Sequence, residues 1–242
     1  MADLAGAAAA ALATGGRFLA ILGRDAGGLT ALRDAATAAI TAPGPGTRLG
    51  IAAGVMAGGH RPVVVLDAAV PPAPQAPDIL AVTQDAGVAA EAVRVGWTVL
   101  QPWAEADVAP LLAGAPLPAL AFLASHDDVP PPDMPAARPV REWERGDLAT
   151  LASSGPGVSA MLELGNRLRA RGVDVGMLEI AALGRPELEP LAGGRAVLVA
   201  GRGSAAAWRR GDWPAGRVDA VTIEGEVDAD LVGAVMALVP AI

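Results

Sequence analysis

The chain has 242 residues, of which 52% are hydrophobic, and its net charge at pH 7 is −8. This length is sufficient for one large domain, or for two of ordinary size with buried cores. All 18 basic residues are Arg, and no Arg-rich run is interleaved with aromatic residues, which argues against a nucleic-acid partner. The chain has no Cys, and His60 and His126 stand far apart, so we expect no metal site.

The first segment, residues 1–16, is rich in Ala. It contains Asp3 and no basic residue, unlike a secretory signal, and no charge-free apolar run in the chain reaches the ~20 residues that a membrane span requires. We therefore expect a cytoplasmic protein without a membrane segment. The Ala-rich segment is interpreted as a helix that is either frayed or part of an interface.

Residues 17–126 alternate apolar runs with small-residue helical segments. This pattern is typical of βαβ units on a mostly parallel sheet that is covered on both faces. In chain order, the predicted elements are strand 17–23, helix 29–40, helix 48–58, strand 62–66, strand 79–83, helix 87–95, strand 97–100, helix 105–112 and strand 119–124. They predict a first α/β domain.

A Pro-rich stretch, residues 127–140, follows this domain. Proline lacks the backbone N–H that a helix needs, so the stretch is interpreted as an extended linker. A second α/β domain is predicted over residues 141–242. Its predicted strands are 148–153, 173–180, 196–200 and 218–223, and its predicted helices are 158–171 and 228–238. The expected fold class is thus α/β with two domains, each a mostly parallel sheet flanked by helices.

Four segments, in this order, resemble the C-terminal half of transketolases. They are "GIAAGVMAGGHRPVVVL" (50–66), "ILAVTQDAG" (79–87), "WTVLQPWAEADV" (97–108) and the strand–helix–strand stretch 148–191. The first is similar to the motif G-[IV]-A-A-G-x-A-x-x-G-x-R-P-V-V of the pyrimidine-binding domain, and the second to V-T-H-D-x-x-G. The same motifs occur in 1-deoxyxylulose-5-phosphate synthases and in the beta subunits of pyruvate-dehydrogenase-type enzymes.

The resemblance implies a pyrimidine-binding domain of the thiamine-diphosphate fold, followed by a transketolase C-terminal domain. A complete transketolase also has a domain that binds the cofactor's diphosphate through Mg²⁺ on a G-D-G…N motif, and this chain has no G-D-G. The resemblance therefore implies a beta-type subunit that needs a separate diphosphate-binding subunit in a hetero-oligomer. Thiamine diphosphate and Mg²⁺ would be held mainly by that partner, and the isolated chain would bind neither.

The resemblance also indicates which residue is missing. In the family, a Glu just before the G-I-A-A-G helix hydrogen-bonds the aminopyrimidine ring and tunes the cofactor's own chemistry. Counting back from Gly50 places Pro45 at this position, and Pro has no proton-accepting group. We therefore predict no catalytic residue on this chain. Small residues in the following helix, from Gly50 to Gly58, permit a close approach by a partner backbone.

Two further residues match family positions, and each has two interpretations. Asp85 corresponds to the D of V-T-H-D, and either stabilises a turn at a strand end or contacts cofactor or substrate. His126 stands where the family has the Arg that grips a sugar phosphate, and is either a surface residue or a substrate-binding one.

Two hypotheses for the function remain open. In the first, the chain is one subunit of a split transketolase-like enzyme, with two-carbon ketol transfer as a possible reaction. In the second, it is a catalytically dead subunit with a structural role in such a complex.

Overall fold

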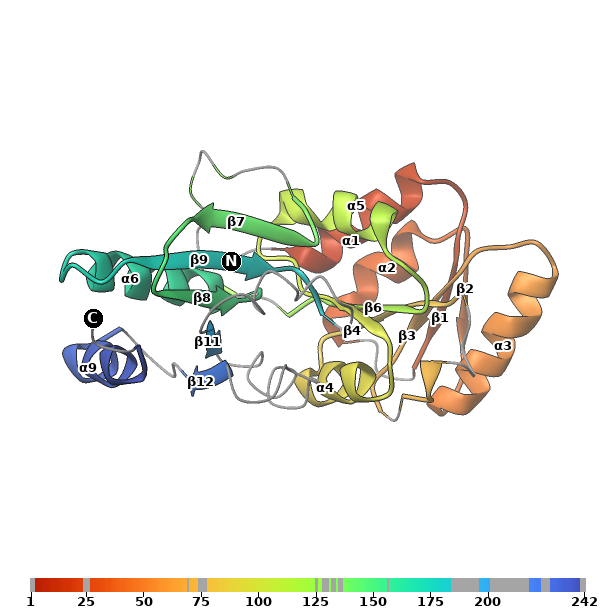
Figure 1. Ribbon diagram of the computed structural model, residues 1–242. Helices are drawn as coiled ribbons and strands as arrows, with labels where there is room; N and C mark the ends of the chain where they lie inside the picture. The colour runs from red at the N-terminus through yellow and green to blue at the C-terminus, as the bar shows by residue number, and fades with distance from the viewer. Residues whose placement is uncertain are drawn as a thin grey trace.

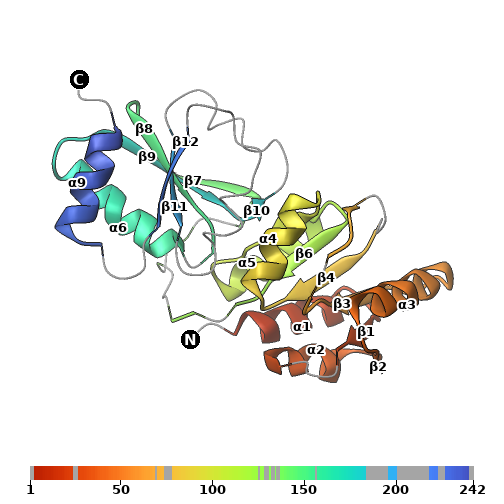
Figure 2. The same ribbon diagram turned by 90° about the horizontal axis from the view of Figure 1, so that it is seen from below.

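The computed structural model contains two β-sheets with helices packed against them (Figure 1). It describes residues 3–23, 27–68, 70–73, 78–124, 126–127, 131, 134, 137–155, 157–183, 196–200, 218–222 and 227–239; for 196–200 and 218–222 it describes the backbone alone. The two sheets lie side by side in both views (Figures 1 and 2), and β10 lies where they meet.

The first sheet has seven strands in the order β10-β5-β6-β4-β3-β1-β2. All neighbouring pairs are parallel except β10 with β5. The strands are β1 (Leu19–Leu22), β2 (Ala38–Thr41), β3 (Pro62–Val65), β4 (Leu80–Thr83), β5 (Thr98–Leu100), β6 (Ala119–Phe122) and β10 (Ala182–Leu183). This is the predicted α/β class, with a mostly parallel sheet.

Helices cover both faces of this sheet, because successive strand residues point to opposite faces and nearly all of them are apolar. One core cluster contains Ile21 and Val64 and packs against α3 (Pro45–Ala57) and α4 (Ala86–Arg94). The other contains Ala20 and Val63 and packs against α1, α2 and α5. These three helices are α1 (Leu4–Thr14), α2 (Thr30–Ala35), which follows the 3₁₀ turn η1 (Gly27–Leu29), and α5 (Glu105–Gly114).

The second sheet has five strands in the order β12-β11-β8-β9-β7. The strands are β7 (Val140–Glu144), β8 (Ala149–Ser153), β9 (Val175–Ile180), β11 (Ala196–Ala200) and β12 (Val218–Thr222). Only β7 is antiparallel to its neighbour. Helix α6 (Gly157–Arg169) places a buried apolar face on β8 and β9, and α9 (Ala229–Leu238) packs beside α6.

The predicted helix 29–40 is wrong in its second half. The helix ends at Ala35, and residues Ala38–Thr41 form β2, the edge strand of the first sheet. The many alanines in this stretch fit the spacing of apolar residues in a helix as well as that in a strand. The strand β1 supplies backbone hydrogen-bond partners, and its residues Leu19 to Leu22 pair in register with Ala38 to Thr41. Pairing with β1 therefore decides the structure.

Two further strands were absent from the prediction. The strand β7 begins at Val140, where the Pro-rich stretch was expected to end, and it pairs antiparallel with β9. The strand β10 follows β9 directly and pairs with β5, so the first sheet takes a strand from a late part of the chain. The division into domains at residues 126–127 and 140–141 stays a prediction.

The Ala-rich first segment is a packed helix. Asp3 caps α1 by accepting the amide of Gly6 at 2.8 Å, and the side chains of Leu4, Ala8 and Leu12 are buried in the first core. The helix lies against α2 and α5. The alternative of a frayed helix is therefore wrong for Leu4–Thr14.

Candidate functional site

Open parallel sheets bind ligands beyond the carboxyl ends of their strands, where neighbouring connections leave in opposite directions. In the first sheet this point lies between β1 and β3, because the chain goes from β1 to β2 on one side and then crosses to β3 on the other. Gly23 follows β1, and Asp67 follows β3 after one residue. The candidate site is therefore the crevice between these two strand ends.

An ion pair between Arg48 and Asp67 occupies this crevice. The side chain of Arg48, on α3, is 2% exposed, whereas the side chain of Asp67 is 44% exposed. Arg48 Nη1 donates to the carbonyl of Val65 at 2.6 Å and to Asp67 Oδ2 at 3.1 Å, and Nη2 pairs with the other carboxylate oxygen. The bidentate geometry gives the pair a fixed orientation over the end of β3.

Two glycines near these strand ends lie close against neighbouring side chains. A Cβ atom at Gly23 would lie within 3.0 Å of both Asp67 Oδ2 and Arg48 Nη1. A Cβ at Gly28 would likewise press on the side-chain amide of Gln84, the residue after β4. The Arg48–Asp67 pair thus lies directly against the backbone at Gly23, just after β1.

Pro45, which the resemblance aligns with the family's Glu, is the first residue of α3. The helix was predicted to begin at Arg48 and begins three residues earlier. Proline suits this position because its fixed φ is helical and the first helical N–H has no partner within the helix. The N-cap residue, Gly44, makes no side-chain hydrogen bond. The tip of α3 therefore carries backbone amides and no acid.

Asp85 is exposed and caps α4. Its Oδ1 accepts the amides of Gly87 at 2.7 Å and Val88 at 3.0 Å. One of its two interpretations, the turn at a strand end, is thereby observed, whereas contact with a cofactor or substrate stays a prediction.

His126 is half-buried and follows β6, the neighbour of β4. The structure thus brings Asp85 and His126 to adjacent strand ends. Pro45 lies farther along the same edge, beyond β3 and β1.

Sequence reasoning missed Arg48 and Asp67. Two signals were present: Arg48 is the one charged residue in "PGPGTRLGIAAGVMAGG", and Asp67 stands immediately after the apolar run "PVVVL". A charge inside a small-residue helix and an acid at a strand end are both expected near a site. Their pairing depends on the β1–β3 crossover, which the sequence does not reveal.

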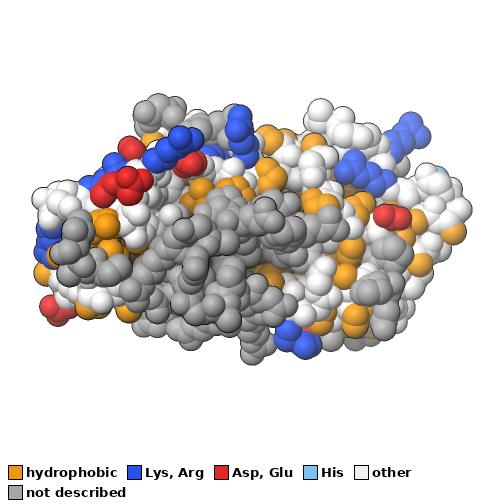
Figure 3. Space-filling model, in the orientation of Figure 1, with side chains coloured by type: hydrophobic (Ala, Val, Ile, Leu, Met, Phe, Trp, Pro, Cys, Tyr) orange, Lys and Arg blue, Asp and Glu red, His pale blue; other side chains and the backbone are white. Residues whose placement is uncertain are grey.

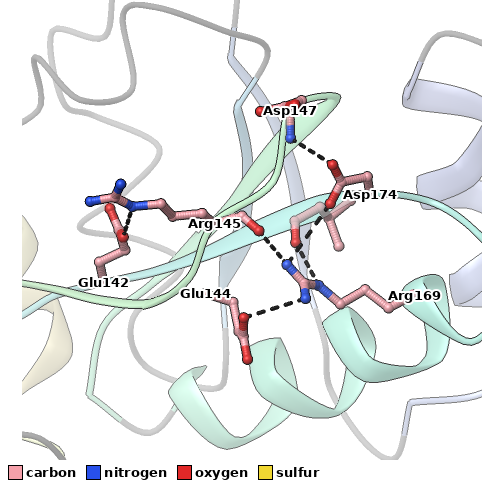
Figure 4. Close-up of polar contacts among 7 residues, drawn as sticks. Glu142, Glu144, Arg145, Asp147, Arg169 and Asp174 are labelled. Atoms are coloured by element: carbon pink, nitrogen blue, oxygen red, sulfur yellow. Dashed lines mark hydrogen bonds and ion pairs between the residues drawn. The ribbon is translucent and has the colours of Figure 1, made fainter.

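A separate cavity of about 200 Å³ lies on the second sheet, beside the connection from β7 to β8. Figure 4 shows how Arg169 of α6 holds this connection. Its Nε donates to the carbonyl of Val175 at 2.9 Å, its Nη1 to Glu144 at 3.3 Å, and its Nη2 to the carbonyl of Arg145. These contacts fix the connection over β9, and among the described residues no cluster of His, Cys, Asp and Glu suits a metal ion.

Comparisons with solved structures find the same arrangement of helices and strands in other proteins. One is the inactive beta4 tetramer of a split-gene transketolase, with a TM-score of 0.63 and 15% identity, over 98% of this chain and 91% of that one. Another is the 2-oxoglutarate:ferredoxin oxidoreductase from Magnetococcus marinus, with a TM-score of 0.59 and 10% identity, over 98% of this chain and 64% of that one. The fold is therefore that of the transketolase C-terminal half.

No protein-family model matches the sequence, and no curated protein matches it either. In the part of the chain that the structure describes, none of the helices combines the length and the apolar surface needed to cross a bilayer.

Proposed function

We propose that this chain is the beta-type subunit of a split, transketolase-like enzyme and acts with a separate subunit that binds the diphosphate of thiamine diphosphate through Mg²⁺. The observation that carries this proposal is the shared arrangement of both sheets over 98% of this chain and 91% of a split-gene transketolase chain. That neighbour is described as an inactive tetramer of beta chains, which agrees with a subunit that needs a different partner for activity. Two-carbon ketol transfer is the reaction class that the resemblance implies.

The residues present do not fit the aminopyrimidine ring in the manner that the resemblance implies. Pro45 offers no acid at the tip of α3, and the Arg48–Asp67 pair lies at the crevice between the ends of β1 and β3, close against Gly23. We therefore assign no catalytic step to this chain. The cofactor would be held mainly by the partner.

A structural role within such a complex is the second candidate, and two observations favour it. The Arg48–Asp67 ion pair lies at the crevice, and α3 presents an uncovered face. Its small exposed residues are Gly46, Gly50, Ala53, Gly54 and Ala57. Figure 3 shows few charged groups at the end of the molecule where α3 lies in Figure 1. Such a face allows another backbone to approach closely.

The cofactor proposal predicts that the isolated chain gives no Mg²⁺-dependent heat of binding with thiamine diphosphate in a calorimetric titration. The same titration on a co-purified complex with a subunit that carries G-D-G…N should give a site. A micromolar site on the isolated chain would contradict the proposal.

The stoichiometry of this complex separates the two candidates. The enzyme-subunit role is favoured if a complex that contains only this chain and the diphosphate-binding subunit transfers ketol units. A complex that is active only with an additional beta-type chain that has the family's Glu favours the structural role.

The uncovered face of α3 predicts that Gly54→Leu hinders assembly and leaves the fold intact. Outside the backbone of its own helix, a Cβ at Gly54 meets no atom within 4 Å, so we expect the fold to accept a side chain that would clash with a partner packed on α3. A clash at a close-packed interface amounts to about 1–3 kcal/mol, which weakens association roughly tenfold to a hundredfold. Sedimentation or co-purification measures this change, and circular dichroism checks the fold.

Gly233→Leu is the matched control, because Gly233 is an equally open, exposed glycine on α9 of the other sheet. We expect normal assembly for this variant. Normal assembly of Gly54→Leu as well would remove the α3 face from the interface.

A further inference from the structure

Three ionisable side chains are buried together where the two sheets meet. Asp107 comes from α5, which packs on the first sheet, while Arg141 and Glu179 come from β7 and β9 of the second sheet. Their exposed fractions are 1%, 3% and 0%, respectively. A buried charge is stable only when it is paired, so this cluster ties the position of α5 to that of β7 and β9.

Arg141 connects the two carboxylates. Its Nη1 donates to Glu179 Oε2 at 2.9 Å, and its Nη2 donates to Asp107 Oδ1. Arg141 and Glu179 are register partners on neighbouring antiparallel strands, so their side chains share one face of the sheet. Asp107 is held from its own side as well, because its Oδ2 accepts the amide of Ala104 at 3.1 Å.

Two tryptophans enclose the cluster. Trp143 Nε1 donates to Glu179 Oε2 at 3.1 Å, and the Arg141 guanidinium lies 5.6 Å from the centre of the Trp143 ring. Trp103, which precedes α5, packs edge-on against Trp143 with ring centres 5.7 Å apart. The indole rings keep solvent away and provide a spectroscopic signal inside the cluster.

The cluster holds one cation against two carboxyl groups, so it carries a net charge of −1 when both are ionised. Glu179 Oε1 and Arg141 Nε have no hydrogen-bond partner among the described residues. Among the described residues, the neighbouring elements β8 and α6 add no compensating charge, because β8 has no ionisable residue and the buried face of α6 is apolar. Of the other charged groups nearby, Glu105 of α5 binds the exposed amide of Asp3, and Glu163 and Arg167 of α6 pair in solvent.

We propose that protonation of Glu179 controls how tightly α5 is held to β7 and β9. When Glu179 is neutral, the positive charge of Arg141 balances the negative charge of Asp107, and the cluster carries no net charge. When Glu179 loses its proton, the two carboxylates compete for one guanidinium and an uncompensated charge remains in the junction. This inference stands apart from the function proposed above.

Burial raises the pKa of Glu179 from its ordinary value of 4.5 to about 7, against the opposing effect of Arg141 and with a further rise from Asp107. The unfolded chain therefore releases this proton near pH 4.5 and the folded chain near pH 7. Between these values the folded state holds more protons, so its stability, complete below the lower value, falls as the pH rises. The folding equilibrium constant falls tenfold for each unit between the unfolded and folded pKa values of Glu179. Its total decrease, from below pH 4.5 to above pH 7, is therefore at most about 300-fold.

The test compares denaturant unfolding of the wild-type chain and Glu179→Gln over a series from about pH 5 to pH 8.5. We expect the wild-type folding constant to fall across the series by up to about 70-fold more than that of the variant, which keeps a neutral side chain throughout. Glu142→Gln is the matched control, because Glu142 is an exposed residue of β7 that is paired with exposed Arg145. It should retain the wild-type slope, and an equal slope for Glu179→Gln would overturn the proposal.

Two measurements on the wild-type chain keep the test independent of any variant. Tryptophan emission should titrate near pH 7, because Trp143 donates directly to Glu179. Amide exchange in β7, corrected for its intrinsic pH dependence, should accelerate above that pH relative to exchange in β3 and β4. Emission that does not change between about pH 6 and pH 8, or constant protection of β7, would overturn the proposal.

Discussion

Replacing Arg141 with Met is expected to lower the free energy of unfolding by about 3 to 5 kcal/mol, the largest effect of any single substitution considered for this chain. The substitution keeps most of the side-chain volume but leaves Asp107 and Glu179, 1% and 0% exposed, without their common cation. The loss should be larger near pH 8 than near pH 5, because a protonated carboxyl group carries no charge. Denaturant unfolding at the two pH values measures it.

Arg145→Met is the matched control, since Arg145 belongs to the β7–β8 connection and its side chain is 89% exposed. It should unfold like the wild-type chain. If Arg141→Met does not fold, the double variant with Glu179→Leu should recover part of the stability, because it removes one of the two stranded carboxylates. Equal stability of Arg141→Met and Arg145→Met would show that the buried cluster does not hold the sheets together.

Gly146→Val is expected to reduce the free energy of unfolding by about 3 kcal/mol, the upper end of the usual range for overpacking. Strand β9 lies between β7 and β8, so the connection between those strands has to cross it. At the crossing, a Cβ on Gly146 would lie within 3.0 Å of the backbone at Val175 and Gly176. Backbone atoms in a sheet cannot rotate away as a side chain does. Thermal or denaturant unfolding gives the size of the effect.

Gly233→Ala provides the comparison for this prediction, because its Cβ meets no atom within 4 Å and Ala favours the helix that contains it. This variant should be as stable as the wild-type chain or more so. A stable Gly146→Val would mean that the connection can lift away from β9 and that the Arg169 contacts do not hold it down.

The central strands of the fold were predictable, because their runs of apolar side chains are visible in the sequence. Apolar runs such as Pro62–Val65, which is buried at every position, are typical of strands in a parallel sheet, and the predicted strands correspond to observed ones. The edge strands were harder. Residues 38–41 are mostly exposed and rich in alanine, and Ala182–Leu183 form a strand of only two residues. Such segments become strands because a neighbour offers unpaired backbone groups, and that information lies elsewhere in the chain.

The contents of the candidate site were not predictable from the sequence. The motif around Gly50 placed Pro45 just before the helix, and the structure makes Pro45 the first residue of α3. What lies at the crevice depends on contacts between distant segments. Arg48 and Asp67 are 19 positions apart in the sequence and meet because β3 pairs with β1 on the side opposite β2. The cluster of Asp107, Arg141 and Glu179 required the packing of α5 against β7, which no local pattern contains.

The strand β10 affects the order in which the protein takes shape during synthesis. Translation proceeds from the N-terminus, so β5 and β6 leave the ribosome well before Ala182 and Leu183. During that interval the backbone groups of β5 that later bind Ala182 and Leu183 have no partner in the sheet, and an open strand edge can pair with another chain. Only after β7, β8 and β9 have been made does β10 reach this edge. Completion of the first sheet therefore waits for most of the second, and a nascent chain halted before that point presents an edge on which neighbouring nascent chains can aggregate.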